Sequence, residues 1–139
     1  MVQTIFVNLA VKDLAVSMKF FRALGFEFNA TFTDANAACL VLSDQIFAML
    51  ITHGRFRDFT PRAISDPLLT TEVLTCLGVD SKVEADRIAD AALANGGSPC
   101  RPPEDLGFMY GRSFCDPDGH IWELAWIDQS QIPSTGANA

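Results

Sequence analysis

The stretch Asp116-Pro117-Asp118-Gly119-His120-Ile121-Trp122-Glu123-Leu124 couples a tight turn to a strand. Asp-Pro-Asp-Gly holds the residue types that turns require, because Pro presets φ, Asp bonds the nearby backbone and Gly accepts positive φ. Apolar and β-branched residues flank the turn on both sides, which predicts strands over 108–115 and 120–127. The sequence therefore predicts a hairpin that ends the folded part of the chain.

The elements before this hairpin occur in the same order in both halves of the chain. Residues 71–79 favour a strand, and Ser81 with Glu84 forms a capping box for a helix that stops before Gly96. In the first half we expect a strand over 4–11, a helix capped by Asp13 and ended by Gly25, and strands near 26–33, 37–43 and 46–52. Placing Val11 on Val79, an offset of 68 residues, puts Asp13 on Ser81. The pattern predicts an α+β chain made of tandem βαβββ units.

The two units define one domain over residues 1–129, with halves at about 1–53 and 71–129 joined by loop 54–70. The tail, residues 130–139, is predicted to be flexible. A connection this long is usually functional or disordered. Its arginines, Arg55, Arg57 and Arg62, either form a lid that meets an anionic ligand or lie on a solvated charged loop.

Composition excludes several classes of function. Hydrophobic residues make up 49% of the 139 residues, enough for a substantial core, while the net charge of −7 argues against nucleic acid and anionic membranes as partners. No apolar run is long enough to span a bilayer, and the N-terminus lacks the regions of a signal peptide, so we expect a cytoplasmic protein. The four cysteines, which lie far apart, are expected to be reduced and mostly buried.

These motifs resemble the vicinal-oxygen-chelate superfamily of glyoxalases, bleomycin-resistance proteins and extradiol dioxygenases. The resemblance rests on Val11-Lys12-Asp13-Leu14, the helix exit Leu24-Gly25-Phe26 and the Asp116–Leu124 segment, in this order along nearly the whole chain. Other stretches, such as Gly107-Phe108-Met109-Tyr110, resemble a bacterial subgroup described as predicted lactoylglutathione lyases. The resemblance implies that the two units form a cupped mixed sheet with helices outside, and that the protein is a homodimer.

The superfamily's enzymes hold a divalent metal in the cup through side chains from four strands. The resemblance maps these ligand positions onto Phe6, Met49, Leu74 and Glu123. Phenyl and isobutyl groups cannot coordinate a hard cation, and a thioether is a poor ligand for one. Only Glu123 matches, so we expect no metal or other cofactor. Zn, Ni, Fe or Mn would bind only if the site has drifted to atypical ligands.

Strand alternation then predicts which side chains line a mostly apolar cup that binds a small molecule. If the mapped positions face inward, the ligand-binding candidates are Phe6, Asn8, Met49, His53, Leu74, Met109 and Ser113. Tyr110, Arg112 and Phe114 would then face the helix side. His53 is either a base or a loop residue, and His120 is expected in a turn or at the rim.

The candidate catalytic groups are Glu123 and Glu72. Glu123 is either a functional carboxylate or a structural one paired with Asn8 or an arginine. Glu72 and Glu123 together would form a carboxylate pair suited to proton abstraction beside a carbonyl.

Three functions follow from these residues and from the resemblance. The first is a metal-independent binder of a small organic ligand. The second is a metal-dependent lyase of the glyoxalase I type, or a dioxygenase, with atypical ligands. The third is a metal-free enzyme that uses Glu123 or Glu72 as its base.

Overall fold

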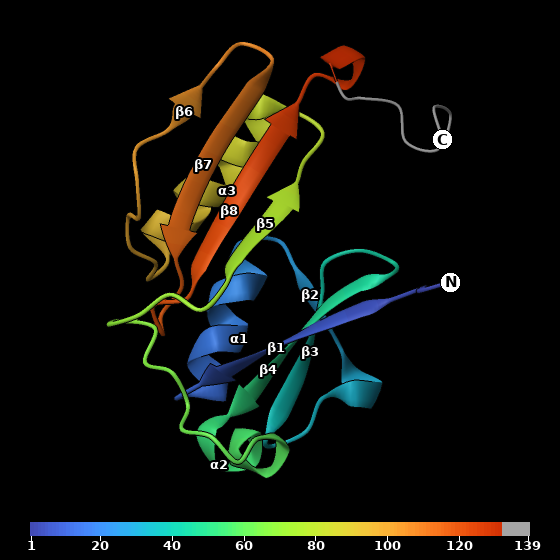
Figure 1. The fold of residues 1–139 in the computed structure, drawn as a ribbon, viewed down its shortest axis with the longest axis vertical. Helices are drawn as coiled ribbons and strands as arrows, with labels where there is room; N and C mark the ends of the chain where they lie inside the picture. Colours follow the sequence, from blue (N-terminus) through green and yellow to red (C-terminus); the bar gives the residue numbers. More distant parts are fainter. Residues whose placement is uncertain (132–139) are drawn as a thin grey trace.

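The computed structural model describes residues 1–131 and confirms the α+β class. The first half contains β1 (Ile5–Val11), α1 (Leu14–Ala23), β2 (Glu27–Asn29), β3 (Ala37–Val41) and β4 (Ile46–Thr52). The second half contains β5 (Leu74–Gly78), α3 (Lys82–Ala94), β6 (Glu104–Asp105), β7 (Met109–Cys115) and β8 (Ile121–Ile127). Each half is therefore one βαβββ unit, as the repeated sequence pattern predicts (Figure 1).

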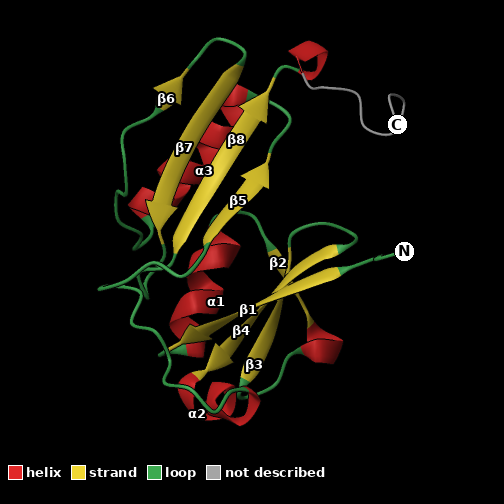
Figure 2. Cartoon of the chain, viewed as in Figure 1, coloured by secondary structure: helices red, strands yellow, loops and turns green. Residues whose placement is uncertain are grey.

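Each unit builds its own four-stranded mixed sheet, in the orders β1-β4-β3-β2 and β5-β8-β7-β6. β1 pairs parallel with β4, and β5 pairs parallel with β8, while the remaining pairs are antiparallel. Both parallel pairs put the first strand of a unit beside its last strand, so the two sheets have the same topology (Figure 2).

One hydrophobic core lies behind both sheets and joins the halves. Phe20 and Phe21 of α1 reach the second sheet, where Phe21 meets Trp122 with ring centroids 5.1 Å apart and Phe20 meets Phe114 at 5.8 Å. Ala85, Ile88, Ala89 and Ala92 of α3 belong to the same buried cluster. Burying a large aromatic side chain stabilises a fold by about 2–3 kcal/mol, so these contacts stabilise the packing of α1 against the second sheet.

The helices α1 and α3 begin where the sequence places their caps. The Asp13 carboxylate accepts a hydrogen bond from the Val16 N–H at 3.2 Å, and the Ser81 hydroxyl accepts one from the Glu84 N–H at 3.0 Å. The capping box at Ser81 is only half formed, because the Glu84 carboxylate bonds Arg87 instead of returning to the cap. After α1, Gly25 adopts φ +97°, the conformation expected of a glycine that ends a helix.

Several sequence-based boundaries need correction. The strand expected near 26–33 stops at Asn29, because the Asn29 side chain caps a 3₁₀ turn over Ala30–Phe32. The strand expected over 71–79 begins only at Leu74. Between α3 and β7 lies the short strand β6 (Glu104–Asp105), which no run of β-branched residues in the sequence indicates.

The connection between the halves is not the plain loop that the sequence predicts over residues 54–70. Its first residues belong to α2 (His53–Phe56), which begins one residue earlier, and to a 3₁₀ turn over Arg57–Phe59. The expected flexible tail begins with a 3₁₀ turn over Gln129–Gln131, and residues 132–139 lie outside the described residues. Within residues 1–131, no helix is both long and apolar enough to cross a bilayer.

The cysteines are free, as expected, but they are less buried than expected. Cys39 is buried and Cys115 is half-buried, whereas Cys76 and Cys100 are exposed. Cys76 is exposed because it lies on the face of the second sheet that is turned away from the core.

Candidate functional site

The turn before β8 is built around the buried carboxylate of Asp116. Its Oδ1 accepts hydrogen bonds from the backbone N–H groups of Asp118, Gly119 and His120, and its Oδ2 accepts one from Trp122 Nε1 at 3.0 Å. Burial raises the pKa of Asp116, while His120 and the Trp122 hydrogen bond act in the opposite direction. The Asp116 carboxylate thus holds the turn and the first core residue of β8 in one arrangement.

The same turn attaches the second half to the first. Asp118 Oδ1 accepts a hydrogen bond from the Lys12 N–H at 2.8 Å, and Asp118 Oδ2 accepts one from the Ser17 hydroxyl at 3.3 Å. His120 Nε2 donates to the Ala10 carbonyl at 2.7 Å. These three bonds hold the beginning of β8 against β1 and α1 of the first unit.

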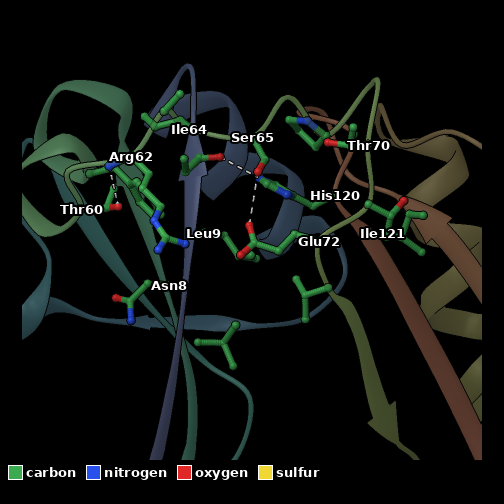
Figure 3. Close-up of a pocket in the computed structure, with 18 residues that line it drawn as sticks. Asn8, Leu9, Thr60, Arg62, Ile64, Ser65, Thr70, Glu72, His120 and Ile121 are labelled. Atoms are coloured by element: carbon green, nitrogen blue, oxygen red, sulfur yellow. Dashed lines mark hydrogen bonds between the residues drawn. The ribbon is translucent and has the colours of Figure 1, made fainter.

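A cavity of about 560 Å³ lies beside this junction. Its walls are β1, the turn before β8 and the segment of the connection from Thr60 to Val73, which we call the strap. The apolar part of the lining includes Val7, Leu9, Ala10, Ile64, Val73 and Ile121. The polar part includes Asn8, Thr60, Arg62, Ser65, Glu72 and His120 (Figure 3). A volume of 300–1,000 Å³ with apolar walls and a few polar groups is typical of small-molecule sites.

The strap places two charged residues, Arg62 and Glu72, in the lining of this cavity. Ser65 donates a hydrogen bond to Glu72 Oε2 at 3.5 Å, which joins the middle of the strap to its last residues. The Thr60 hydroxyl accepts a hydrogen bond from the Arg62 N–H at 3.1 Å and so orders the start of the strap. Leu68 packs on Gly119, so close that a Cβ at Gly119 would lie 2.7 Å from Leu68 Cδ2.

Glu123 lies elsewhere, on the open face of the second sheet. Its Oε2 accepts a hydrogen bond from Arg101 Nη2 at 2.6 Å, and the Glu123 side chain is only 16% exposed. The hydrogen bond with Glu123 raises the pKa of Arg101. The sequence left two structural partners open for Glu123, Asn8 or an arginine. In the structure the partner is an arginine, Arg101.

Two further polar side chains surround this ion pair. Cys76 is the register partner of Glu123 on β5, and Ser113 is its partner on β7. Burial raises the pKa of the Cys76 thiol, and the neighbouring Glu123 raises it further. The thiol is thus held in its neutral form near neutral pH, which makes it a weaker nucleophile than a thiolate.

The residues at the resemblance's metal positions do not fit a divalent metal. Phe6, Leu74 and Met49 supply no oxygen or nitrogen donor, and the carboxylate of Glu123 is bonded to the Arg101 guanidinium. A cation at Glu123 would have to displace that guanidinium or be repelled by it. Over residues 1–131, no group of three or more His, Cys, Asp or Glu side chains has the arrangement of a metal site.

The predicted ligand-binding residues lie in three places. Asn8 lines the cavity. Phe6 and Met49 lie on the open face of the first sheet. There Phe6 stacks on Phe47, with ring centroids 4.9 Å apart. Leu74, Met109 and Ser113 lie on the second sheet, where Phe114 faces the core as alternation predicts. His53 is the first residue of α2 and does not line the cavity.

The structure does not bring Glu72 and Glu123 together. Glu123 pairs with Cys76, and Glu72 precedes Cys76 by four residues, which corresponds to about 13 Å of extended chain. Glu72 instead lines the cavity with Ser65. A shared proton between the two carboxylates requires direct contact, so the carboxylate pair considered from the sequence does not form.

The sequence did not indicate Arg101 as the partner of Glu123. It also did not distinguish Arg62 from the other two arginines of the connection. Arg101 lies in a Pro-rich connection with no strand period, so nothing local indicates where its side chain points. Of the three lid arginines, only Arg62 lines the cavity, while Arg55 bonds Asp58 at 2.8 Å. The residues around Arg62, Ala63-Ile64-Ser65, show no alternation of apolar and polar side chains that would indicate which of them faces a cavity.

Comparison with known proteins places this geometry in a known fold. Residues 3–43 match the family model described as bleomycin resistance protein-like N-terminal. No curated protein sequence gives a significant match to the chain. A hypothetical protein from S. aureus is 28% identical, with a TM-score of 0.76 over 91% of this chain and 94% of that one.

Two further solved structures share the fold at lower identity. A glyoxalase/bleomycin resistance protein/dioxygenase family enzyme from Burkholderia phytofirmans is 16% identical, with a TM-score of 0.72 over 88% of this chain and 96% of that one. A bleomycin resistance determinant encoded on the transposon Tn5 is 22% identical, with a TM-score of 0.63 over 90% of this chain and 98% of that one. The chain therefore has the glyoxalase/bleomycin-resistance/dioxygenase fold, as its motifs predict.

Proposed function

We propose that this chain binds a small organic molecule in the cavity between its two halves and carries out no metal-dependent chemistry. The observation that carries the proposal is the cavity of about 560 Å³, with apolar walls and polar groups at Asn8, Arg62 and Glu72. The fold is also similar to that of a bleomycin resistance determinant encoded on the transposon Tn5.

The arrangement at Glu123 supports the same proposal. A general base needs a free carboxylate within hydrogen-bond reach of the substrate. Glu123 is only 16% exposed and accepts a hydrogen bond from Arg101 at 2.6 Å. The alternatives, a lactoylglutathione lyase or dioxygenase with atypical metal ligands and a metal-free enzyme using Glu123 or Glu72, gain no comparable support.

The binding test uses indole as a neutral apolar probe and ligand-observed saturation-transfer NMR. Ala63 lines the cavity and is exposed, so Ala63→Trp fills space there without disturbing the core. We expect indole to receive saturation from the unmodified protein and from Ala23→Trp, a control at the exposed end of α1, but not from Ala63→Trp. Equal saturation of indole by all three proteins would place binding elsewhere and refute the proposal.

The enzymatic alternatives are tested by metal analysis and by an assay with the glutathione hemithioacetal of methylglyoxal, before and after chelation. We expect far less than one metal ion per chain and no product. One tightly bound Zn, Ni, Fe or Mn per chain would support the metal-dependent alternative. Turnover that survives chelation and is lost in Glu123→Gln or Glu72→Gln would support the metal-free one.

We also propose that the protein is a homodimer, with each open sheet face covered by a second copy. The faces carry Phe6, 47% exposed, and Leu74, 55% exposed, and apolar side chains exposed in patches mark interaction sites. Light scattering after size exclusion should give about twice the 15.1 kDa chain mass. Phe6→Asp should yield the monomer, and Val83→Asp on the exposed side of α3 should not.

A further inference from the structure

The cavity under the strap carries opposite charges that the protein itself leaves unpaired. Arg62 and Glu72 both line it, and Figure 3 shows the guanidinium and the carboxylate pointing toward one another across it. Neither residue takes part in any of the ion pairs formed among residues 1–131. Glu72 has one long hydrogen bond, from the Ser65 hydroxyl at 3.5 Å, and the Arg62 side chain has none among these residues.

The surroundings of these two charges are apolar. Leu9, Ile64, Val73 and Ile121 belong to the apolar part of the lining, while Arg62 and Glu72 themselves are exposed at its open side. Opposite charges attract more strongly where low-dielectric walls replace water. A cation and an anion that face the same apolar space are therefore suited to a ligand that carries both an anionic and a cationic group.

We infer that the cavity binds a small zwitterion of the amino-acid or short-peptide class, with Arg62 bonding its carboxylate, Glu72 its ammonium group, and the apolar walls its side chains. This inference rests on the proposed function, because it names the ligand class for the same cavity. Asn8 and Thr60, which also line the cavity, add neutral hydrogen-bonding groups of the kind that a peptide or amide requires.

The predicted selectivity comes from both charges together. A planar guanidinium binds a carboxylate through two parallel N–H···O bonds, and a carboxylate accepts from an ammonium group by charge-assisted hydrogen bonds. Each such contact replaces hydrogen bonds that the same groups make to water in the unbound state. Losing one contact therefore lowers the affinity by roughly tenfold. An analogue without one of its two charges should therefore bind about tenfold more weakly.

The probes are L-phenylalanine and the dipeptide L-leucyl-L-phenylalanine, with the N-acetyl dipeptide as the anion-only form and the dipeptide amide as the cation-only form. Affinities are measured by calorimetry on the full chain. We expect at least one zwitterion to bind, and the dipeptide to bind about tenfold better than either singly charged form.

Two variants connect each charge to its residue. Arg62→Gln should weaken the dipeptide and its N-acetyl form by about tenfold while leaving the amide unchanged, and Glu72→Gln should weaken the dipeptide and the amide while leaving the N-acetyl form unchanged. Arg57→Gln and Glu27→Gln are the charge-matched controls, because neither residue lines the cavity, and they should change nothing.

The outcomes separate this inference from the proposed function. If indole binds in the cavity but neither zwitterion does, or if all dipeptide forms bind equally, the zwitterion inference is wrong and the proposed function stands. If neither indole nor any zwitterion binds, both are wrong. If the variants change affinity without regard to the probe's charge, Arg62 and Glu72 form an internal pair that shapes the strap, and the inference is wrong.

Discussion

The Asp118 carboxylate accepts a hydrogen bond from the backbone N–H of Lys12 at 2.8 Å, across 106 residues of sequence. The residue belongs to the Asp-Pro-Asp-Gly turn, whose composition alone predicts only a local reversal of the chain. In the fold, the same turn bonds the strand and the helix of the other half through Lys12 and Ser17. A local signal in the sequence thus becomes a long-range contact that holds the cavity wall in place.

Removing this carboxylate should loosen the junction between the halves. Asp118→Ala leaves the Lys12 N–H and the Ser17 hydroxyl without their partner, so the free energy of unfolding should fall by about 1–3 kcal/mol. Urea unfolding monitored by circular dichroism measures the change. Asp44→Ala, in the exposed turn before β4, is the control and should be nearly neutral. Equal midpoints for the two variants would show that the turn does not hold the halves together.

Gly97 should tolerate no side chain, because of the backbone around it. A Cβ there would lie 2.8 Å from the Ala92 carbonyl oxygen and 2.9 Å from that of Cys115, and neither can move without shifting α3 or β7. Gly97→Ala should therefore destabilise the fold by about 1–3 kcal/mol in urea unfolding.

Gly54 offers the matched control for that substitution. It lies in α2, and apart from its chain neighbours and the backbone of its own helix no atom lies within 4 Å of the position that an added methyl group would take, so Gly54→Ala should be neutral or slightly stabilising. A Gly97→Ala protein as stable as Gly54→Ala would contradict the close backbone packing after α3.

The network at Asp86 should make part of the stability depend on pH. Hydrogen bonds from Tyr110 at 2.6 Å and from Arg112 at 2.6 Å lower the pKa of the Asp86 carboxyl below its ordinary 3.8. Because the lowered pKa favours the charged form in the fold, this contribution is present above about pH 4 and is lost as the pH falls through the lowered value.

The measurement is urea unfolding of the unmodified protein and of Asp86→Asn between pH 7 and pH 3. The difference in unfolding free energy should be constant from pH 7 to about pH 5 and should shrink below pH 4. Asp44→Asn is the control and should show no such trend, because the Asp44 side chain forms none of the hydrogen bonds found among residues 1–131. A difference that grows on acidification would contradict the assigned direction of the pKa shift.

The Arg101–Glu123 ion pair should contribute measurably, though modestly, to stability. Its distance is 2.6 Å, but Arg101 is 46% exposed, so water and salt screen the attraction. A double-mutant cycle with Arg101→Gln and Glu123→Gln should give a coupling energy of about 0.5–1 kcal/mol, reduced at high salt.

The Arg55–Asp58 pair provides the comparison, since its side chains are 47% and 58% exposed. Its coupling energy should be smaller, because both charges are solvated. If the two cycles give the same value, the partial burial of Glu123 does not strengthen its ion pair.

The sequence by itself determined the order of α1, α3 and every strand except β6, but it did not indicate α2. Asp13 and Ser81 cap their helices, Gly25 ends α1, and strand β4 covers Ile46–Thr52 as expected. These features depend on hydrogen bonds and periods that involve residues a few positions apart, and for that reason they can be read from a single chain. Alternation also placed Ser113 and Glu123 on one face of the second sheet and Phe114 in the core.

Only the tertiary structure decided the environment of each candidate residue. Arg101 reaches Glu123 across 22 positions, and His120 reaches Ala10 across 110. Glu72 lines a cavity with Arg62 instead of meeting Glu123. The physical reason is that hydrogen bonds and charge interactions act over a few ångströms in space, and which distant side chains come within that range is set by how the two halves pack on their shared core.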